Sequence, residues 1–165
     1  MFTLEFLPES RIAFLRRTGP YGEANGLQME KLKSWAAAHD LLRADSAVLG
    51  IARDDPDRTP PHACRYDTCL VLSGDTDGTD DAGDAGDAGG NEAAGTEVRV
   101  DRLAGGRHAV LTVAHTPEGL AQAWAGLFGR LAAQGLVFDT TRPVVERYRP
   151  GLLARHLCEI CVPVR

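Results

Sequence analysis

The pattern of apolar and polar residues predicts the order strand, helix, strand, strand in the first half of the chain. A strand-like apolar run at 11–15 precedes a Gly-Pro turn at 19–20 and a helix expected over 25–42. Strands are expected at 47–52 and 64–72. The residues expected on the buried face of the helix recur at helical spacing: Leu32, Trp35, His39 and Leu42.

The second half repeats this order. A strand is expected at 108–113, and a helix should begin at Pro117 behind an N-cap at Thr116 and end near Gly135. Two strands follow, at 143–148 and 157–164. The apolar stripe of this helix consists of Leu120, Trp124, Leu127 and Leu131. The recurrence indicates an internal duplication and an α+β fold, in which two units place their antiparallel sheets side by side with one helix on each.

Residues 73–97 separate the halves and carry six Asp and two Glu, with no Lys or Arg. This low-complexity segment lacks the apolar residues that would offset the entropy of ordering it, so a disordered acidic loop is predicted. A single domain is expected, with repeat one at 1–72 and repeat two at 98–165. The loop is either a tolerated insertion or an acidic segment that attracts a basic partner.

Composition and charge narrow the class of protein. A length of 165 residues, 44% hydrophobic and 25% charged, suits one soluble globular domain. The formal net charge of −5 does not favour direct binding of nucleic acid. The chain shows neither a membrane-spanning apolar run nor the basic start of a signal peptide, so a cytoplasmic protein with reduced cysteines and no membrane partner is expected.

Four short motifs occur in order outside the acidic segment: R-R-T-G-P-Y at 16–21, R-Y-D-T-C at 65–69, V-E-R-Y at 145–148 and C-V-P-V at 161–164. Together they resemble motifs of the GyrI-like, or bacterial effector-binding, domain family, although Val145 stands where an aromatic residue is often found. The resemblance implies two strand–helix–strand–strand repeats with pseudo-twofold symmetry around a central cleft, which binds lipophilic, cationic or drug-like compounds.

The same resemblance bears on function and partners. Members of the family serve as effector domains of transcription factors, including the AraC type, or stand alone. Some stand-alone relatives restrain gyrase, and others hydrolyse strained electrophilic natural products. A strand that starts at Arg11 leaves no room for a helix-turn-helix module, so a stand-alone protein is expected. A monomer is expected because a closed domain of two units needs no second chain.

Glu146 is the leading candidate for the central site residue. Alternate residues of a strand share a face, so Glu146 and Tyr148 should point the same way, while Val145 and Arg147 point the other way. A carboxylate among aromatic side chains is costly unless a positive group meets it, and a cationic ligand would do so. Burial would also raise the Glu146 pKa and suit it to acid–base catalysis. The alternative from spacing alone is an exposed edge-strand glutamate.

Aromatic residues supply the remaining candidates for ligand binding. Tyr21 follows a Gly-Pro turn that can aim its side chain across a cleft, and Tyr66 and Tyr148 offer a ring with a hydroxyl. Trp124 lies on the stripe of the second helix, and Trp35 lies on that of the first, where core packing is favoured. For each of these residues, packing in the core is the alternative to ligand contact.

Metal and cofactor sites are not expected. The C-x-x-C at Cys158 and Cys161, and the pair Cys64 and Cys69, have spacings of three and five, which place each pair on opposite strand faces. No nucleotide-binding or serine-nucleophile motif is present. Arg65 and Asp67 share a strand face and are expected to form a structural ion pair.

Three functions follow, in order of preference. The first is a stand-alone protein that senses or sequesters lipophilic cations, with Glu146 as the electrostatic anchor. The second is a hydrolase in which Glu146 acts on water and Tyr148 donates a hydrogen bond. The third is a protein that inhibits gyrase, with the acidic loop imitating DNA phosphates.

Overall fold

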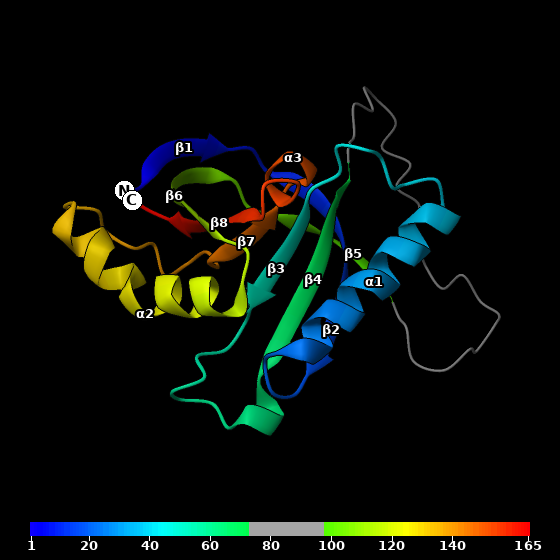
Figure 1. The fold of residues 1–165 in the computed structure, drawn as a ribbon, viewed down its shortest axis with the longest axis horizontal. Helices are drawn as coiled ribbons and strands as arrows, with labels where there is room; N and C mark the ends of the chain where they lie inside the picture. The colour runs from blue at the N-terminus through cyan, green and yellow to red at the C-terminus, as the bar shows by residue number, and fades with distance from the viewer. Residues whose placement is uncertain (73–97) are drawn as a thin grey trace.

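The structure is a computed structural model that describes residues 1–72 and 98–165 (Figure 1). The strands in these ranges form one antiparallel sheet of eight strands, and two long helices lie beside it. In chain order the strands are β1 (Thr3–Leu7), β2 (Ser10–Thr18), β3 (Val48–Ala52), β4 (Arg65–Leu72), β5 (Arg99–Leu103), β6 (Gly106–Ala114), β7 (Val145–Tyr148) and β8 (Leu157–Pro163). The helices are α1 (Glu23–Ala38), α2 (Pro117–Ala133) and the short α3 (Pro150–Leu153), with a 3-10 turn at Pro61–Ala63.

The sheet joins the two halves of the chain at its centre. Its order is β1-β6-β8-β7-β3-β4-β2-β5, so the two units meet where β7 pairs with β3. The edge strands cross over: β1, in the first half of the chain, pairs with β6 of the second half, and β5, in the second half, pairs with β2 of the first. The prediction of an α+β fold with antiparallel strands is therefore confirmed, and the strands of both units form one continuous curled sheet.

Apolar side chains cover both faces of the sheet. On one face α2 buries Leu127 and Leu131 against β6 and β8, and α1 buries Leu32 and Ala36 against β2 and β4. The opposite face carries a second cluster that includes Phe14, Leu49, Val110 and Cys161. Leu7 at one edge of the sheet and Leu103 at the other both pack against this second cluster, so the sheet curls around it.

The first helix is shorter at its C-terminal end than expected. It ends at Ala38, two residues before Asp40 adopts a left-handed backbone with φ of 55°. His39 and Leu42, which were predicted on the buried face, are therefore exposed, while Leu32 is buried as predicted. The second helix matches its prediction more closely, because the Thr116 side chain accepts a hydrogen bond from the Gly119 amide and Gly135 takes the left-handed conformation after the last turn.

The predicted ion pair between Arg65 and Asp67 is wrong. Asp67 is fully buried and accepts hydrogen bonds from Arg16 (Nε to Oδ1, 2.7 Å) and Arg53 (Nε to Oδ2, 2.7 Å). Arg65 instead donates to Asp54 at 2.8 Å. Arg16 lies directly opposite Asp67 in the β2–β4 register, where side chains are closer than at positions two apart on one strand.

The described ranges contain neither a helix long and apolar enough to cross a membrane nor a group of three metal-ligating side chains placed to hold an ion. All four cysteines are buried free thiols. Cys158 packs on the helix-covered face of the sheet, and Cys161 packs on the opposite face. The C-x-x-C residues therefore diverge, as their spacing on a strand predicts. The predicted acidic loop at 73–97 lies outside the described residues.

We expect the buried thiols to resist alkylation in the native protein. Burial raises the pKa of Cys69, Cys158 and Cys161 to about 12 from an ordinary value of 9.0. At pH 8 their reactive thiolate fraction is therefore roughly a thousandfold below that of an ordinary thiol. Iodoacetamide labelling followed by mass spectrometry should modify these three sites only after denaturation. Rapid labelling of any of them in the native protein would contradict this burial.

Candidate functional site

Glu146 lies on β7 beside the junction of the two units, and three aromatic side chains converge on its carboxylate. The indole Nε1 of Trp124 on α2 donates to Oε1 at 2.7 Å. The Tyr148 hydroxyl donates to Oε2 at 2.5 Å, and the Tyr66 hydroxyl on β4 lies 3.4 Å from the same oxygen. The structure thus brings together four of the five residues that the sequence suggested for a binding site.

Gly50 leaves the space through which the Tyr66 side chain reaches Glu146. It lies on β3 between β4 and β7, in register with Thr68 on one side and Glu146 on the other. A Cβ at this position would lie only 1.9 Å from the Tyr66 hydroxyl oxygen and 3.4 Å from Glu146 Oε2. The missing side chain therefore leaves a passage across β3. Sequence reasoning overlooked Gly50, although a lone glycine inside an apolar strand is a signal of close approach.

The electrostatics of the cluster are those of a carboxylate surrounded by neutral donors. No described residue forms an ion pair with Glu146. Burial raises the pKa of Tyr66 and Tyr148, and the nearby negative charge of Glu146 raises both further. Both hydroxyls therefore keep their protons and remain hydrogen-bond donors to the carboxylate. Such a site can attract a cation or hold a polarised water molecule.

Tyr21, the fifth predicted residue, contacts the ring of Tyr66 rather than Glu146 itself. Its ring meets that of Tyr66 edge-on, with centroids 5.9 Å apart. Its hydroxyl lies 2.9 Å from the carbonyl oxygen of Arg65 and 3.0 Å from that of Asp54, so it ties the loop after β3 to the start of β4. Tyr21 thus supports the ring of Tyr66 and does not touch the carboxylate. The Trp35 ring stacks on that of His39, with centroids 4.5 Å apart, and packs against the core that α1 covers.

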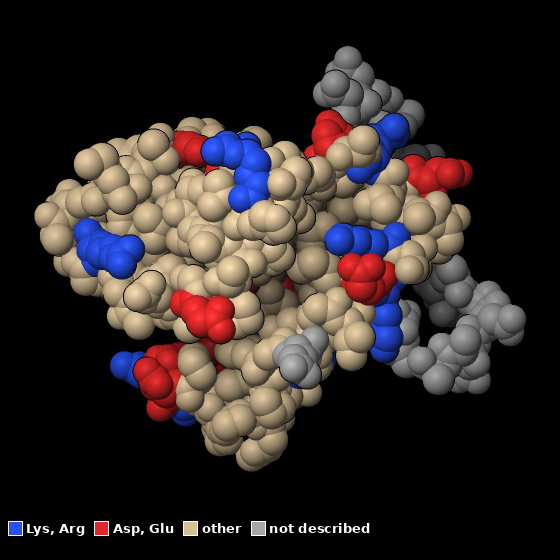
Figure 2. All heavy atoms as spheres, in the orientation of Figure 1, with Lys and Arg blue, Asp and Glu red and all other residues tan. Residues whose placement is uncertain are grey.

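The cluster lies on the helix-covered face of the sheet, where Trp124 of α2 reaches Glu146. Figure 2 shows the surface hollowed between α2 and the part of the chain that carries α1. Both halves of the chain contribute to the cluster, since Tyr66 and Gly50 come from the first half, and Trp124, Glu146 and Tyr148 come from the second.

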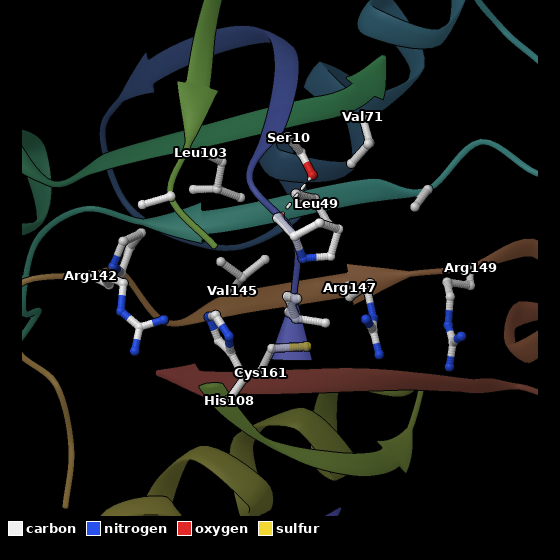
Figure 3. Close-up of a pocket in the computed structure, with 15 residues that line it drawn as sticks. Ser10, Leu49, Val71, Leu103, His108, Arg142, Val145, Arg147, Arg149 and Cys161 are labelled. Carbon is white, nitrogen blue, oxygen red and sulfur yellow. Dashed lines mark hydrogen bonds between the residues drawn. The ribbon is translucent and has the colours of Figure 1, made fainter. Parts of the chain in front are cut away.

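A second cavity lies on the opposite face of the same sheet, inside the curl. It has a volume of about 210 Å³, and Val145, Arg147, Leu49 and Cys161 contribute to its wall (Figure 3). Sequence reasoning missed it, although the alternation along β7 that assigns Glu146 to one face assigns Val145 and Arg147 to the other.

Comparisons with known proteins agree on the family of the chain. A family model described as "GyrI-like small molecule binding domain" matches residues 1–165. The SPbeta prophage-derived putative transcriptional regulator YosT of Bacillus subtilis (strain 168) is 35% identical over 164 residues, covering 99% of this chain and 98% of the relative. A DNA gyrase inhibitor of Edwardsiella piscicida is 31% identical over 165 residues, covering 98% of this chain and 96% of the relative.

Solved structures of low sequence identity share the fold. EcmrR in its complex with DNA matches with a TM-score of 0.68 at 14% identity, and the match covers all of this chain but only 57% of EcmrR. SAV2435 bound to tetraphenylphosphonium matches with a TM-score of 0.57 at 15% identity, covering 100% of this chain and 94% of that one. A hydrolase from Listeria innocua gives a TM-score of 0.58 at 15% identity, covering 99% and 91%.

Proposed function

This chain belongs to the GyrI-like small-molecule-binding domain family, and from that premise we propose that it binds lipophilic cations in the cleft beside Glu146. The observation that carries the proposal is a carboxylate held by three neutral aromatic donors, with no ion pair from the described residues. A cationic ligand would supply the missing positive charge, and aromatic faces would add cation–π attraction of roughly 0.5 to 2 kcal/mol. The tetraphenylphosphonium bound to SAV2435 is a ligand of this class.

Each residue of the cluster has a defined part in this proposal. Glu146 is the electrostatic anchor. Tyr148, Tyr66 and Trp124 fix the orientation of its carboxylate and present aromatic surface to the ligand, while Tyr21 supports Tyr66. Because both units contribute to one cleft, we propose that they act as a single domain around a pseudo-twofold axis at the β7–β3 junction and that a monomer suffices for binding.

Tetraphenylphosphonium binding tests the role of Glu146. We expect the Glu146→Gln variant to bind this cation at least about tenfold more weakly than the wild type, because the amide keeps the shape of the side chain but loses its charge. Isothermal titration calorimetry measures the affinity. Glu118→Gln, an exposed change in the first turn of α2, is the matched control and should leave the affinity unchanged. Equal affinity of Glu146→Gln and wild type would refute the anchor role.

Hydrolysis of a strained electrophile is the second candidate function. The Tyr148 hydroxyl, 2.5 Å from Glu146, and the Trp124 indole hold the carboxylate in one orientation, as a general base for water requires. Listeria innocua structures of the same fold are described as hydrolases. Mass spectrometry of electrophiles incubated with the protein decides between the two functions: a product heavier by one water, formed by the wild type and absent with Glu146→Gln, establishes hydrolysis.

Gyrase inhibition is a third candidate, favoured by the relative from Edwardsiella piscicida. A supercoiling assay with purified gyrase tests it directly. Inhibition that persists after deletion of residues 76–95 would exclude the acidic segment as the inhibitory element.

A further inference from the structure

The cavity inside the curl differs in chemistry from the Glu146 cleft, although the two share β7. Its central wall is apolar and is formed by Leu49, Val71, Leu103, Val145 and Cys161. Figure 3 shows Val145 at the middle of this wall, with Arg147 and Arg149 toward one end and Arg142 toward the other. The cavity thus combines an apolar body with basic ends.

All charged residues in the lining are basic. Arg142, Arg147 and Arg149 contribute to the wall together with His108, and no Asp or Glu of the described residues does so. The pKa of His108 is lowered, first by burial and then by the positive charges of Arg142 and Arg147, although a hydrogen bond to the Gly106 carbonyl and the charge of Asp139 oppose this effect. The charged side chains that face the cavity are therefore cationic.

The acidic partners of these arginines lie outside the lining. Arg147 donates to Glu159 at 2.7 Å and to Glu5 at 3.1 Å, and Arg149 donates to Glu159 at 2.5 Å. Within residues 1–72 and 98–165, only one nitrogen of the Arg149 guanidinium has a hydrogen-bond partner, and 48% of the side chain is exposed. Arg149 therefore keeps N–H donors that can turn toward an incoming acceptor.

At the other end of the cavity, Arg142 holds neighbouring segments of the backbone together. Its guanidinium donates to Asp139 and to the carbonyl oxygens of Gly105, Arg107 and Val164. These contacts use all three of its nitrogens and four of its five N–H groups, so more donor capacity is left at the end that holds Arg147 and Arg149.

We propose that this cavity is a second ligand site, which takes a small amphipathic carboxylate. The carboxylate binds Arg149 at the rim beside Arg147, and the apolar tail lies along Val145 toward Leu103. A volume of about 210 Å³ is below the range of roughly 300–1,000 Å³ that is usual for drug-sized ligands, so a ligand of about ten non-hydrogen atoms is the appropriate size. The proposal does not depend on the function assigned to the Glu146 cleft.

Octanoate, octan-1-ol and octylammonium have the same tail and differ in charge, so they separate the two sites. In ¹H–¹⁵N correlation spectra of the full chain, octanoate should shift backbone amides of β7 and β8 and leave the Trp124 indole resonance in place. Octan-1-ol should bind at least about tenfold more weakly, because it lacks the charge-assisted hydrogen bonds to Arg149. Octylammonium should perturb the Trp124 indole.

Two variants complete the test. Arg149→Met keeps an unbranched apolar side chain but removes the guanidinium and its charge, and it should weaken octanoate binding about tenfold or more. Ala104→Phe fills the cavity from an exposed lining position and should abolish octanoate binding while the arginines stay unchanged. Two controls should leave octanoate binding intact: Glu146→Gln on β7, whose side chain points to the other face of the sheet, and Arg130→Met at an exposed position of α2.

The proposal fails if octanoate binds no more tightly than octan-1-ol, or if its affinity is unchanged in both Arg149→Met and Ala104→Phe. A loss of octanoate binding in Glu146→Gln would also overturn it, since the carboxylate would then occupy the other cleft. Failure of tetraphenylphosphonium to bind contradicts the proposed function of the Glu146 cleft and leaves the octanoate result unaffected.

Discussion

Replacing Asp67 by asparagine should destabilise the fold by about 3 kcal/mol, because removing one partner of a buried ion pair leaves charges without compensation. Asp67 has no exposed side-chain surface, and it accepts three hydrogen bonds from Arg16 and Arg53. The amide of asparagine keeps one acceptor oxygen but turns N–H groups toward guanidinium donors. Urea unfolding at pH 7, followed by circular dichroism, measures the difference in the free energy of unfolding.

The exposed pair of Arg102 and Glu9 provides the control, since its N–O distance is also 2.7 Å but its side chains are 71% and 56% exposed. Glu9→Gln should change the free energy of unfolding by less than about 1 kcal/mol. Comparable effects of Asp67→Asn and Glu9→Gln would show that burial does not strengthen the Asp67 contacts.

Acid should reduce the difference in the free energy of unfolding between the wild type and Asp67→Asn. Burial acts to raise the Asp67 pKa, but hydrogen bonds and charges from Arg16 and Arg53 outweigh it, so the pKa is lowered in the folded state. The unfolded chain therefore takes up the proton first, below about pH 4, and the stability that Asp67 contributes is lost as the pH falls through its folded pKa. Urea unfolding at pH 3 should accordingly show a smaller destabilisation by Asp67→Asn than at pH 7.

The order of the two units could be predicted because their central strands are buried. In β2 and β6 the same succession of buried and exposed positions occurs over nine residues, and such runs produce a clear apolar signal. The edge strands β1 and β5 were missed for the opposite reason. Most of their side chains are exposed, and β5 has the sequence Arg-Val-Asp-Arg-Leu, so neither strand carries the run of buried residues found in β2 and β6.

The candidate site could be anticipated in part. Alternation along β7 and the family resemblance together selected Glu146 and Tyr148, and the structure places both beside Trp124 and Tyr66. Gly50 and the cavity around Arg149 were missed, because both depend on the pairing of β3 with β7. That pairing joins positions nearly 100 residues apart, and no local pattern in the sequence specifies it.

The β7 strand links the two candidate sites through its alternation. Its residues Glu146 and Tyr148 lie on the helix-covered face of the sheet, while Val145 and Arg147 line the cavity inside the curl. The strand thus places the carboxylate of Glu146 on one face of the sheet and the guanidinium of Arg147 on the other. The two sites should therefore select ligands of opposite charge, which is the contrast that octylammonium and octanoate measure.

Gly50→Ala should both destabilise the protein and disrupt the cleft. The new Cβ would lie 1.9 Å from the Tyr66 hydroxyl oxygen and 2.8 Å from its Cζ, so the tyrosine ring must move off β3. Overpacking of this kind costs about 1–3 kcal/mol, and the displaced hydroxyl no longer reaches Glu146. Thermal unfolding should show the loss of stability, and calorimetry should show tetraphenylphosphonium binding weakened by about tenfold or more.

Two further variants isolate the cause. Gly129→Ala on α2 adds a Cβ with no atom within 4 Å, and it should stabilise the protein by up to about 1 kcal/mol because alanine is the better helix former. In the Gly50→Ala/Tyr66→Phe double variant the closest clash disappears, so its destabilisation should be smaller than the sum of the two single effects. Strict additivity would mean that Gly50 acts through the β3 backbone alone, and the passage for Tyr66 would not be the reason for a glycine at this position.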